Sequence, residues 1–188
     1  MTIVKYGNPI LKQKATPVWA VTEEVRDLAK AMVKAMHAVN GVGLAAPQVG
    51  RGEALCVIDI PPDAEDKAFV EMNAGIAMPL IMINPEITEL VGTLRRSEGC
   101  LSFPDLHVDI TRAKTVTFSY TDMKGQRQTA TASGLLARAV QHELDHIHGV
   151  LLFDKMSPAQ RLMNKRRLRD IKEEGIQESG SSGIQNGI

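Results

Sequence analysis

Residues 141–146 constrain this chain more than any other segment, because they read Gln-His-Glu-Leu-Asp-His and contain the pattern His-Glu-x-x-His. Histidines four positions apart lie one above the other on a helix, so both imidazoles can reach one metal ion. Glu143 lies between them in sequence and can act as a general base on a water molecule. The metal would lower the pKa of its bound water toward neutrality, which makes a hydroxide nucleophile available at pH 7. The pattern therefore predicts a helix that serves metal-assisted hydrolysis.

The residues around this motif have the pattern of a core-packing helix. Ser133 precedes it as a potential N-cap, and Gly149 follows it as a potential stop. The apolar positions at helical spacing are Leu135, Leu136, Ala139 and Val140. His148 is out of phase with the two histidines of the motif, so we expect it to be exposed at the helix end.

The third metal ligand is left open by the motif, although a hydrolytic metal site usually has three protein ligands and one open position. The candidates are Cys56, Cys100, His37, His107 and several carboxylates. Cys56 lies in the apolar run 54–60, which is typical of a buried strand, so we interpret it as a core residue. Cys100 follows Gly99, which allows close backbone approach. From residue types alone, a buried and inert cysteine remains the preferred interpretation of Cys100.

Length and composition favour one soluble domain. The chain has 188 residues, a formal net charge of zero and two cysteines, which argues against a disulfide scaffold or a DNA-binding protein. No stretch approaches the roughly 20 apolar residues of a membrane helix, and the N-terminus lacks a signal-peptide pattern. We therefore expect a cytoplasmic protein without membrane contact. Residues 1–174 are expected to form a single catalytic domain, and the Gly/Ser-rich residues 175–188 a disordered tail.

Periodicity and turn residues predict the remaining elements. Thr22 is expected to cap a helix that ends near Asn40, and Ser157-Pro158 to start a basic C-terminal helix. The predicted strands cover residues 54–60, 80–84, 86–94, 115–120 and 126–131. Residues 61–79 form a long connector, a feature that is often functional or mobile.

Three separated segments resemble the peptide deformylase family. Residues 41–48 read Gly-Val-Gly-Leu-Ala-Ala-Pro-Gln, residues 98–102 read Glu-Gly-Cys-Leu-Ser, and residues 141–146 carry the histidine motif. Their order and spacing also match. The resemblance implies an α+β fold, with antiparallel sheets around a central helix that carries the histidine motif and a C-terminal helix outside. It implies a metal-dependent hydrolase that removes the N-formyl group from the N-terminal formyl-methionine of newly made polypeptides.

The resemblance also implies the roles of residues at the reaction centre. Cys100, His142 and His146 would bind the metal, and Glu143 would be the general base. Gln48 and the backbone N–H of Leu101 would stabilise the oxyanion. A thiolate with two imidazoles can hold Fe²⁺, Zn²⁺, Ni²⁺ or Co²⁺. Because family members typically use Fe²⁺, we expect that ion in the cell.

Substrate contacts follow from the same resemblance. The segment 41–48 is expected to pair with the peptide like an added strand. The expected substrate-binding residues are Gly43, Leu44, Gly99, Leu135 and Arg138. The stem of Arg138 would pack beside the methionine pocket while its head reaches outward. The groups expected to orient the imidazoles are Glu98, Arg112 and Asp145.

The basic C-terminal helix suggests contact with the ribosome, because clustered cations suit RNA phosphates. Its cations include Arg161, Lys165, Arg166, Arg167 and Arg169. The alternative is a solvated helix face.

Two other functions compete with deformylation. A metallopeptidase with the same histidine motif would cleave internal amide bonds, but it would have no use for the segment 98–102. A non-enzymatic module with a structural zinc site would have no use for a base at Glu143.

Overall fold

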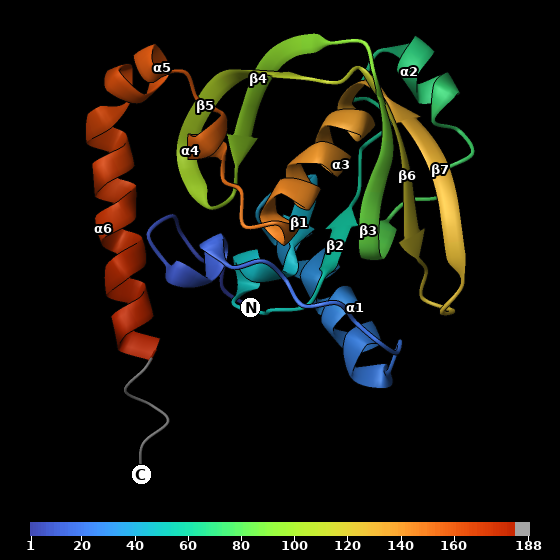
Figure 1. Cartoon of the computed structure of the whole chain (residues 1–188), viewed down its shortest axis with the longest axis horizontal. Helices are drawn as coiled ribbons and strands as arrows, with labels where there is room; N and C mark the ends of the chain where they lie inside the picture. Colours follow the sequence, from blue (N-terminus) through green and yellow to red (C-terminus); the bar gives the residue numbers. More distant parts are fainter. Residues whose placement is uncertain (183–188) are drawn as a thin grey trace.

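The computed structural model describes residues 1–182 and contains two antiparallel sheets (Figure 1). The strands are β1 (Gly43–Ala45), β2 (Leu55–Ile58), β3 (Leu80–Val91), β4 (Leu94–Cys100), β5 (Phe103–Arg112), β6 (Thr115–Thr121) and β7 (Arg127–Ser133). The larger sheet has the order β1-β2-β3-β6-β7, and the smaller sheet pairs β4 with β5. The predicted strands 115–120 and 126–131 are confirmed as β6 and β7, which pair as a hairpin. The sequence placed the start of this hairpin at residue 107, but residues 107–112 belong to β5, which pairs with β4.

The helix that carries the histidine motif is α3 (Gly134–Ile147), and it lies between the two sheets (Figure 1). The other helices are η1 (Pro9–Lys12), α1 (Glu23–Ala38), η2 (Ala46–Val49), α2 (Lys67–Met72), α4 (Leu152–Lys155), α5 (Pro158–Met163) and α6 (Lys165–Ser182). The predicted α+β fold with a central motif helix is therefore confirmed. Within residues 1–182, no helix has the length and apolar content that crossing a membrane requires.

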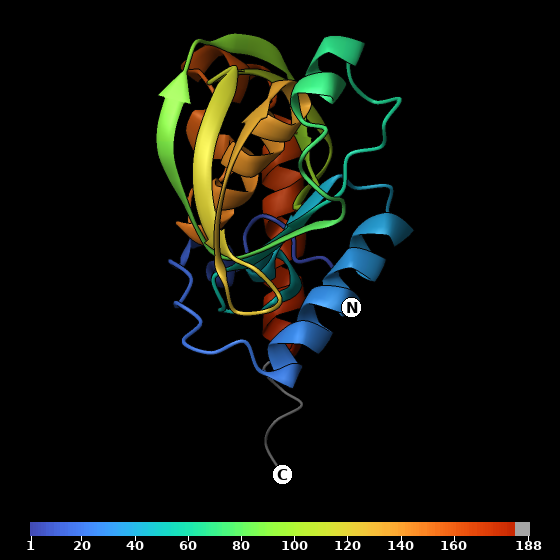
Figure 2. The same ribbon diagram turned by 90° about the vertical axis from the view of Figure 1, so that its right-hand side faces the viewer.

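Strand β2 separates the two halves of the main core because its side chains alternate between the sheet faces. Cys56 and Ile58 belong to a cluster with the apolar face of α3, which confirms that Cys56 is a core residue. Leu55 and Val57 face the opposite way and pack with the apolar side of α1. Figure 2 shows α1 along the outer side of the sheet. As expected, the hydroxyl of Thr22 caps α1 by accepting a hydrogen bond from the N–H of Val25 at 3.4 Å.

A separate apolar cluster joins the β4–β5 hairpin to the C-terminal helix. Phe103 and Ile110 of β5 contribute to it, together with Leu168 and Ile171 of α6. Tyr6 from the N-terminal segment stacks on Phe103, with 4.7 Å between the ring centroids. This cluster lies beside the end of β4, so it supports the strand that delivers Cys100.

Two strand predictions are wrong in detail. The expected strands 80–84 and 86–94 form one strand, β3, because the register shifts between Ile83 and Glu86 instead of breaking. Asn84 absorbs this irregularity with a φ of 49°. Strand β4 was not predicted, because its residues 95–97 are polar and exposed and show no clear apolar alternation.

The expected disordered tail is wrong for residues 175–182, which continue helix α6. Lys5 holds this part of the helix through ion pairs with Glu174 at 3.0 Å and Glu178 at 2.7 Å. Gly175 lies so close to the N-terminal segment that an added Cβ would come 2.3 Å from the carbonyl oxygen of Tyr6. Long-range contacts therefore order a segment of weak helix formers. Residues 183–188 lie outside the described part of the chain.

Candidate active site

Three side chains with metal-ligand chemistry converge between α3 and the end of β4. Cys100 ends β4, and His142 and His146 lie on successive turns of α3. One donor atom from each side chain lies within 4.8 Å of the donor atoms of the other two. The sulfur of Cys100 is 3.3 Å from Nε2 of His146. The structure thus brings the predicted third ligand to the two histidines, although 42 positions separate Cys100 from His142 in sequence.

These side chains fit a divalent transition-metal ion. Both histidines are buried, at 8% and 1% relative exposure, and a thiolate with two imidazoles forms a soft, electron-donating set. Nδ1 of His142 is hydrogen-bonded to the carboxylate of Glu98 at 2.7 Å. This bond favours the tautomer that keeps Nε2 free of a proton, as a metal ligand requires. Nδ1 of His146 has no hydrogen-bond partner among the described residues.

Glu98 is the centre of a buried network of charged groups beside the site. Its oxygens accept hydrogen bonds from Arg112 at 2.6 and 2.7 Å and from Arg138 at 2.8 Å. Arg112 also donates to Asp145 at 2.8 Å. Burial would raise the pKa of Glu98, but Arg112 and His142 hold that pKa well below its ordinary range. Glu98 is therefore a carboxylate, and it contacts the imidazole of His142 directly.

Arg138 differs from the sequence expectation. Its residue is only 5% exposed, and its guanidinium points into the protein instead of reaching outward. Besides its bond to Glu98, it donates to the carbonyl oxygens of Leu94 at 2.9 Å and Ile110 at 3.2 Å. A buried guanidinium needs such acceptors, and the β4–β5 hairpin supplies them. Arg138 still lines the cavity described below.

Glu143 is 3% exposed and lies beside the proposed ligands. Burial raises the pKa of its carboxyl group to about 7, and one of its oxygens has no hydrogen-bond partner among the described residues. Its other oxygen lies against Gly43 of β1, where an added Cβ would be only 2.2 Å away. Gly43 therefore makes room for the carboxylate. A carboxyl group with a pKa near neutrality is suited to both accept and return a proton.

Gln48 and Leu101 both lie beside Cys100 and line the cavity described below. The side-chain oxygen of Gln48 accepts the N–H of Ala45 at 2.8 Å, which turns its amide nitrogen toward the site. That nitrogen donates to the hydroxyl of Ser102 at 3.3 Å and lies 3.6 Å from the sulfur of Cys100. Ser102 was not expected to take part, and its only sequence signal is its place in the segment 98–102. Leu101 lies in the turn between β4 and β5, next to the cavity.

A cavity of about 600 Å³ opens onto this cluster. Its walls include Gly43, Gly99, Leu135 and Ala139, together with Gln48, Cys100, Leu101, His142 and Glu143. The ring of His107 covers Gly99, where an added Cβ would lie 2.7 Å from its Nε2. Leu44 is fully buried in the cluster with α1 instead of lining the cavity. Strand alternation explains this correction, because Gly43 faces the site and Leu44 therefore faces away.

Strand β1 lies at the edge of the large sheet. It pairs with β2 through the register Gly43 to Ile58 and Ala45 to Cys56. The residues just before it, Val39 to Val42, also line the cavity. An extended chain could therefore add to this edge while its first residue enters the cavity, as the resemblance implied.

The chain is similar to known proteins over most of its length. The family model described as polypeptide deformylase matches residues 1–162. A peptide deformylase of Prochlorococcus marinus is 41% identical over 178 residues, covering 94% of this chain and 80% of the relative. One from Dictyoglomus thermophilum is 43% identical over 153 residues, covering 81% of this chain and 90% of the relative.

Solved structures agree with these sequence relatives. The structure of Arabidopsis thaliana peptide deformylase 1B in complex with an inhibitor has a TM-score of 0.83 and 32% identity, covering 96% of this chain and 94% of that one. The peptide deformylase of Thermus thermophilus has a TM-score of 0.79 and 32% identity, covering 92% of this chain and 98% of that one.

Proposed function

This chain belongs to the polypeptide deformylase family, and from that premise we propose how its own residues carry out the reaction. The family activity is the metal-dependent hydrolysis of the formyl group on nascent polypeptides. The observation that carries the proposal is the buried carboxylate of Glu143, which lines the same cavity as Cys100 and His142. His146 completes the ligand group with these two residues. A base, a metal-ligand group and room for a substrate thus meet at one place.

Cys100, His142 and His146 would hold one divalent ion, which we propose to be Fe²⁺ in the cell, with Zn²⁺, Ni²⁺ or Co²⁺ as substitutes. When bound, the ion would polarise the formyl oxygen and make a water molecule more acidic. Glu98 orients the imidazole of His142 through its bond to Nδ1, and Arg112 and Arg138 hold the Glu98 carboxylate in place. Asp145 holds the guanidinium of Arg112 through a second ion pair.

Glu143 is proposed to move the protons of the reaction. It takes a proton from the attacking water as the new C–O bond forms at the formyl carbon. It then delivers that proton to the amine nitrogen of methionine as the C–N bond breaks, so formate and a free amino terminus are released. A pKa near 7 makes the carboxyl group a competent acceptor and a competent donor at neutral pH.

The developing negative charge on the formyl oxygen needs hydrogen-bond donors. The side-chain amide of Gln48 is held in place by Ala45 and Ser102, so it is preorganised for this role. The backbone N–H of Leu101 is proposed as the second donor. One such donor typically stabilises a transition state by about 3–4 kcal/mol.

The cavity is proposed to receive the side chain of the formylated methionine. Leu135 and Ala139 give it an apolar wall on α3, and a flexible thioether chain packs well against such a surface. The peptide backbone would lie along the free edge of β1, beside Gly43. Main-chain hydrogen bonds of this kind carry little sequence preference, which suits an enzyme that serves every nascent chain.

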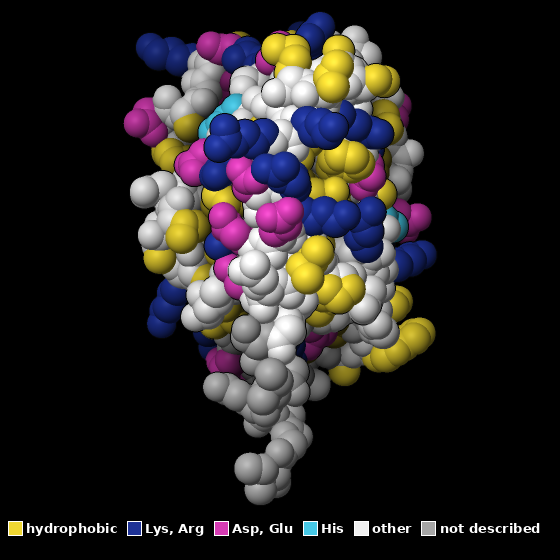
Figure 3. Space-filling view, turned by 90° about the vertical axis from the view of Figure 1, so that its left-hand side faces the viewer, with side chains coloured by type: hydrophobic (Ala, Val, Ile, Leu, Met, Phe, Trp, Pro, Cys, Tyr) yellow, Lys and Arg dark blue, Asp and Glu magenta, His cyan; other side chains and the backbone are white. Residues whose placement is uncertain are grey.

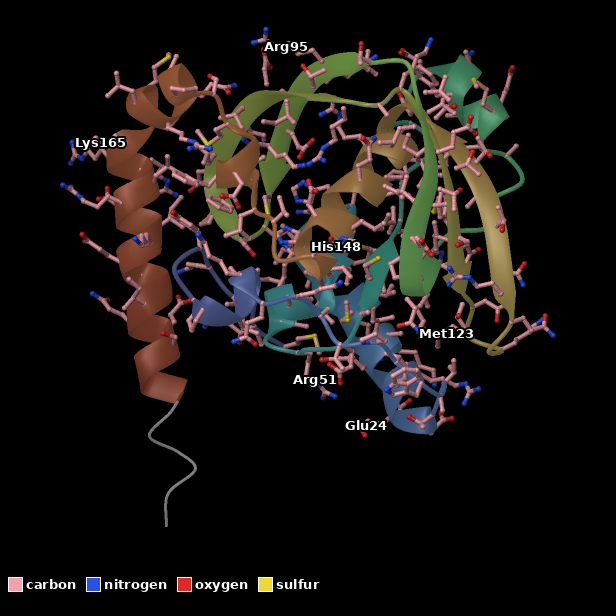
Figure 4. All side chains as sticks on the ribbon, in the orientation of Figure 1. Glu24, Arg51, Arg95, Met123, His148 and Lys165 are labelled. Carbon is pink, nitrogen blue, oxygen red and sulfur yellow. The ribbon has the colours of Figure 1, made fainter. Side chains whose placement is uncertain are left out.

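Contact with the ribosome is proposed through α6. Figure 3 shows Lys and Arg side chains on the face that carries this helix, mixed with acidic and hydrophobic side chains. In Figure 4, Lys165 points away from the sheets. Arg166 and Lys172 are also exposed on α6, whereas Arg167 is engaged with Asp105 at 2.8 Å. The cytoplasm, where translation takes place, is the proposed location.

Paired assays test the proposed function. We expect hydrolysis of a formyl-Met peptide, and little or none of its acetyl-Met counterpart or of an internal amide bond. Glu143→Ala should keep its metal and lose at least about a thousandfold in kcat, because the proton acceptor is gone. Glu173→Ala, an exposed change on α6, should keep full activity.

The competing functions predict other outcomes. Cleavage of the internal amide alone would indicate a metallopeptidase and reject the proposal. Unchanged turnover in Glu143→Ala would reject the role of the base.

A further inference from the structure

The connector of residues 61–79 packs against the first turn of α3. Its short helix α2 lies beside the start of α3 and the end of β7 in Figures 1 and 2. The aromatic ring of Phe69 lies against Gly134, where an added Cβ would be 2.6 Å from the ring. The side-chain nitrogen of Lys114, just before β6, lies over this ring at 5.6 Å from its centroid.

Glu65 of the connector caps α3 in place of the residue that the sequence predicted. Ser133 occupies the N-cap position, but its hydroxyl is bonded to the hydroxyl of Thr115 at 2.9 Å and makes no capping bond. The carboxylate of Glu65 accepts the N–H of Leu135, one of the first N–H groups of the helix. The negative charge of this carboxylate also interacts favourably with the positive end of the helix dipole.

Asn73 holds the start of the same helix through the backbone of Ser133. Its side-chain oxygen accepts the N–H of Ser133 at 2.9 Å, and its side-chain nitrogen donates to the carbonyl oxygen of Ser133 at 3.0 Å. Both backbone groups of Ser133 are thus held by one connector side chain. An ion pair between Asp66 and Arg96 at 3.2 Å ties the start of α2 to β4.

The turn held in this way is part of the cavity wall. Leu135, whose N–H is bonded to Glu65, lines the cavity, and so do Arg138 and Ala139 on the next turn. A shift or fraying of the first turn of α3 would therefore change the shape of the wall that faces the methionine side chain. His142 and Glu143 lie two turns further along. His142 is anchored by its bond to Glu98, and Glu143 is buried against Gly43.

We propose that the connector acts as the N-terminal cap of α3, and that Glu65 and Asn73 are positioning residues that set the methionine pocket. The inference rests on the proposed function, since it assigns a side-chain pocket to that reaction. Loss of the cap should weaken selection for methionine more than it slows the chemical step. One methylene in an apolar pocket discriminates by a factor of about 10 or more, so loosening the wall should reduce that factor.

The test compares Glu65→Ala and Asn73→Ala with the native chain, all loaded with the same metal and matched for metal content. Asp63→Asn is the control, because Asp63 is exposed in the same connector and makes no hydrogen bond or ion pair to the described residues. Two quantities are measured: hydrogen exchange at the amides of residues 134–138, and the ratio of kcat/KM for a formyl-Met peptide to that for a formyl-Ala peptide. Glu65→Gln, which keeps an acceptor oxygen, serves as the conservative variant.

We expect faster amide exchange and a selectivity ratio that falls by about threefold to tenfold in both alanine variants, through a rise in KM for the formyl-Met peptide. Glu65→Gln should recover most of the ratio, and Asp63→Asn should equal the native chain. An unchanged ratio would overturn the inference, even if the alanine variants melt at a lower temperature. Absence of turnover by the native chain would instead overturn the proposed function, and the pocket assignment with it.

Discussion

At the scale of single residues, two positions that the sequence linked to the substrate instead accommodate or bind other groups of the protein. Gly43 leaves space for the carboxylate of Glu143, and the guanidinium of Arg138 is buried against Glu98. Neither role is visible in the residue type, because both depend on which segment lies opposite. The consequences of changing them are correspondingly different.

Gly43→Ala should reduce kcat strongly while leaving metal content unchanged. The new Cβ would overlap the Glu143 carboxylate, and a displacement of about 1 Å at a reacting group can lower the rate about 100-fold. Steady-state kinetics with a formyl-Met peptide and metal analysis of the same sample would check this. The matched control is Gly52→Ala, because a Cβ at Gly52 meets no atom within 4 Å. Full activity in Gly43→Ala would contradict the placement of Glu143.

Arg138→Met should lower the free energy of unfolding by about 3 kcal/mol, since it leaves part of the buried Glu98 carboxylate and two carbonyl oxygens without their donor. Urea unfolding monitored by circular dichroism would measure it. Arg95→Met provides the comparison, because Arg95 is exposed (Figure 4) and its pair with Asp109 spans 3.6 Å. That change should cost less than about 1 kcal/mol. Equal losses in the two variants would argue against a buried role for Arg138.

At the scale of elements, the site is a junction between a strand and a helix. Cys100 comes from the last position of β4, whereas His142 and His146 come from the middle and end of α3. The two elements belong to different layers, with β4 in the small sheet and α3 between the sheets. A bound ion would therefore tie the layers together and couple occupancy of the site to stability.

Removal of the metal by a chelator should lower the melting temperature, because an ion that binds only the folded state stabilises it by about 2.7 kcal/mol at 100 times its Kd. Differential scanning calorimetry with and without chelator would measure the shift. The shift should vanish in Cys100→Ala. It should persist in His148→Ala, because His148 is exposed at the end of α3 and lies outside the ligand group. A chelator shift of the same size in Cys100→Ala would contradict the ligand assignment.

At the scale of the whole molecule, the C-terminal helix is part of the folded body that supports the site. Leu168 and Ile171 of α6 complete the apolar cluster of Phe103 and Ile110 in the hairpin. Arg167 reaches the carbonyl oxygen of Pro104, beside the cavity, at 2.8 Å. The hairpin that carries Cys100 is thus covered by residues from the far end of the chain.

Ile171→Ala should lower the free energy of unfolding by about 3 kcal/mol, because Ile171 is fully buried and its truncation leaves a cavity. Ile176→Ala on the same helix is the control, since that side chain is 50% exposed and its change should stay within about 0.5 kcal/mol. Chemical denaturation of both variants would measure the difference. A small effect of Ile171→Ala would mean that α6 contributes little to the folded body.

Local sequence was sufficient for features whose physics is local. The period of apolar residues predicted α1 and α3, and β-branched residues around a turn predicted the β6–β7 hairpin. Spacing of His142 and His146 on one helix predicted a shared metal, and their adjacency to Glu143 predicted a base beside it. The family resemblance, carried by three short segments, added Cys100 and Gln48 to this group.

Tertiary structure decided the features that depend on partners far away in sequence. Strand β4 has a polar exposed face and forms because it pairs with β5 in a hairpin, so its sequence shows no apolar pattern that predicts a strand. Residues 175–182 are helical because Lys5 pairs with Glu178 and the backbone of Tyr6 packs against Gly175. The cap of α3 comes from Glu65 instead of Ser133, since Thr115 engages the serine hydroxyl. The sequence by itself determined which chemistry this protein can perform, and only the fold decided which groups hold that chemistry in place, because burial and hydrogen-bond partners are set by contacts between distant segments.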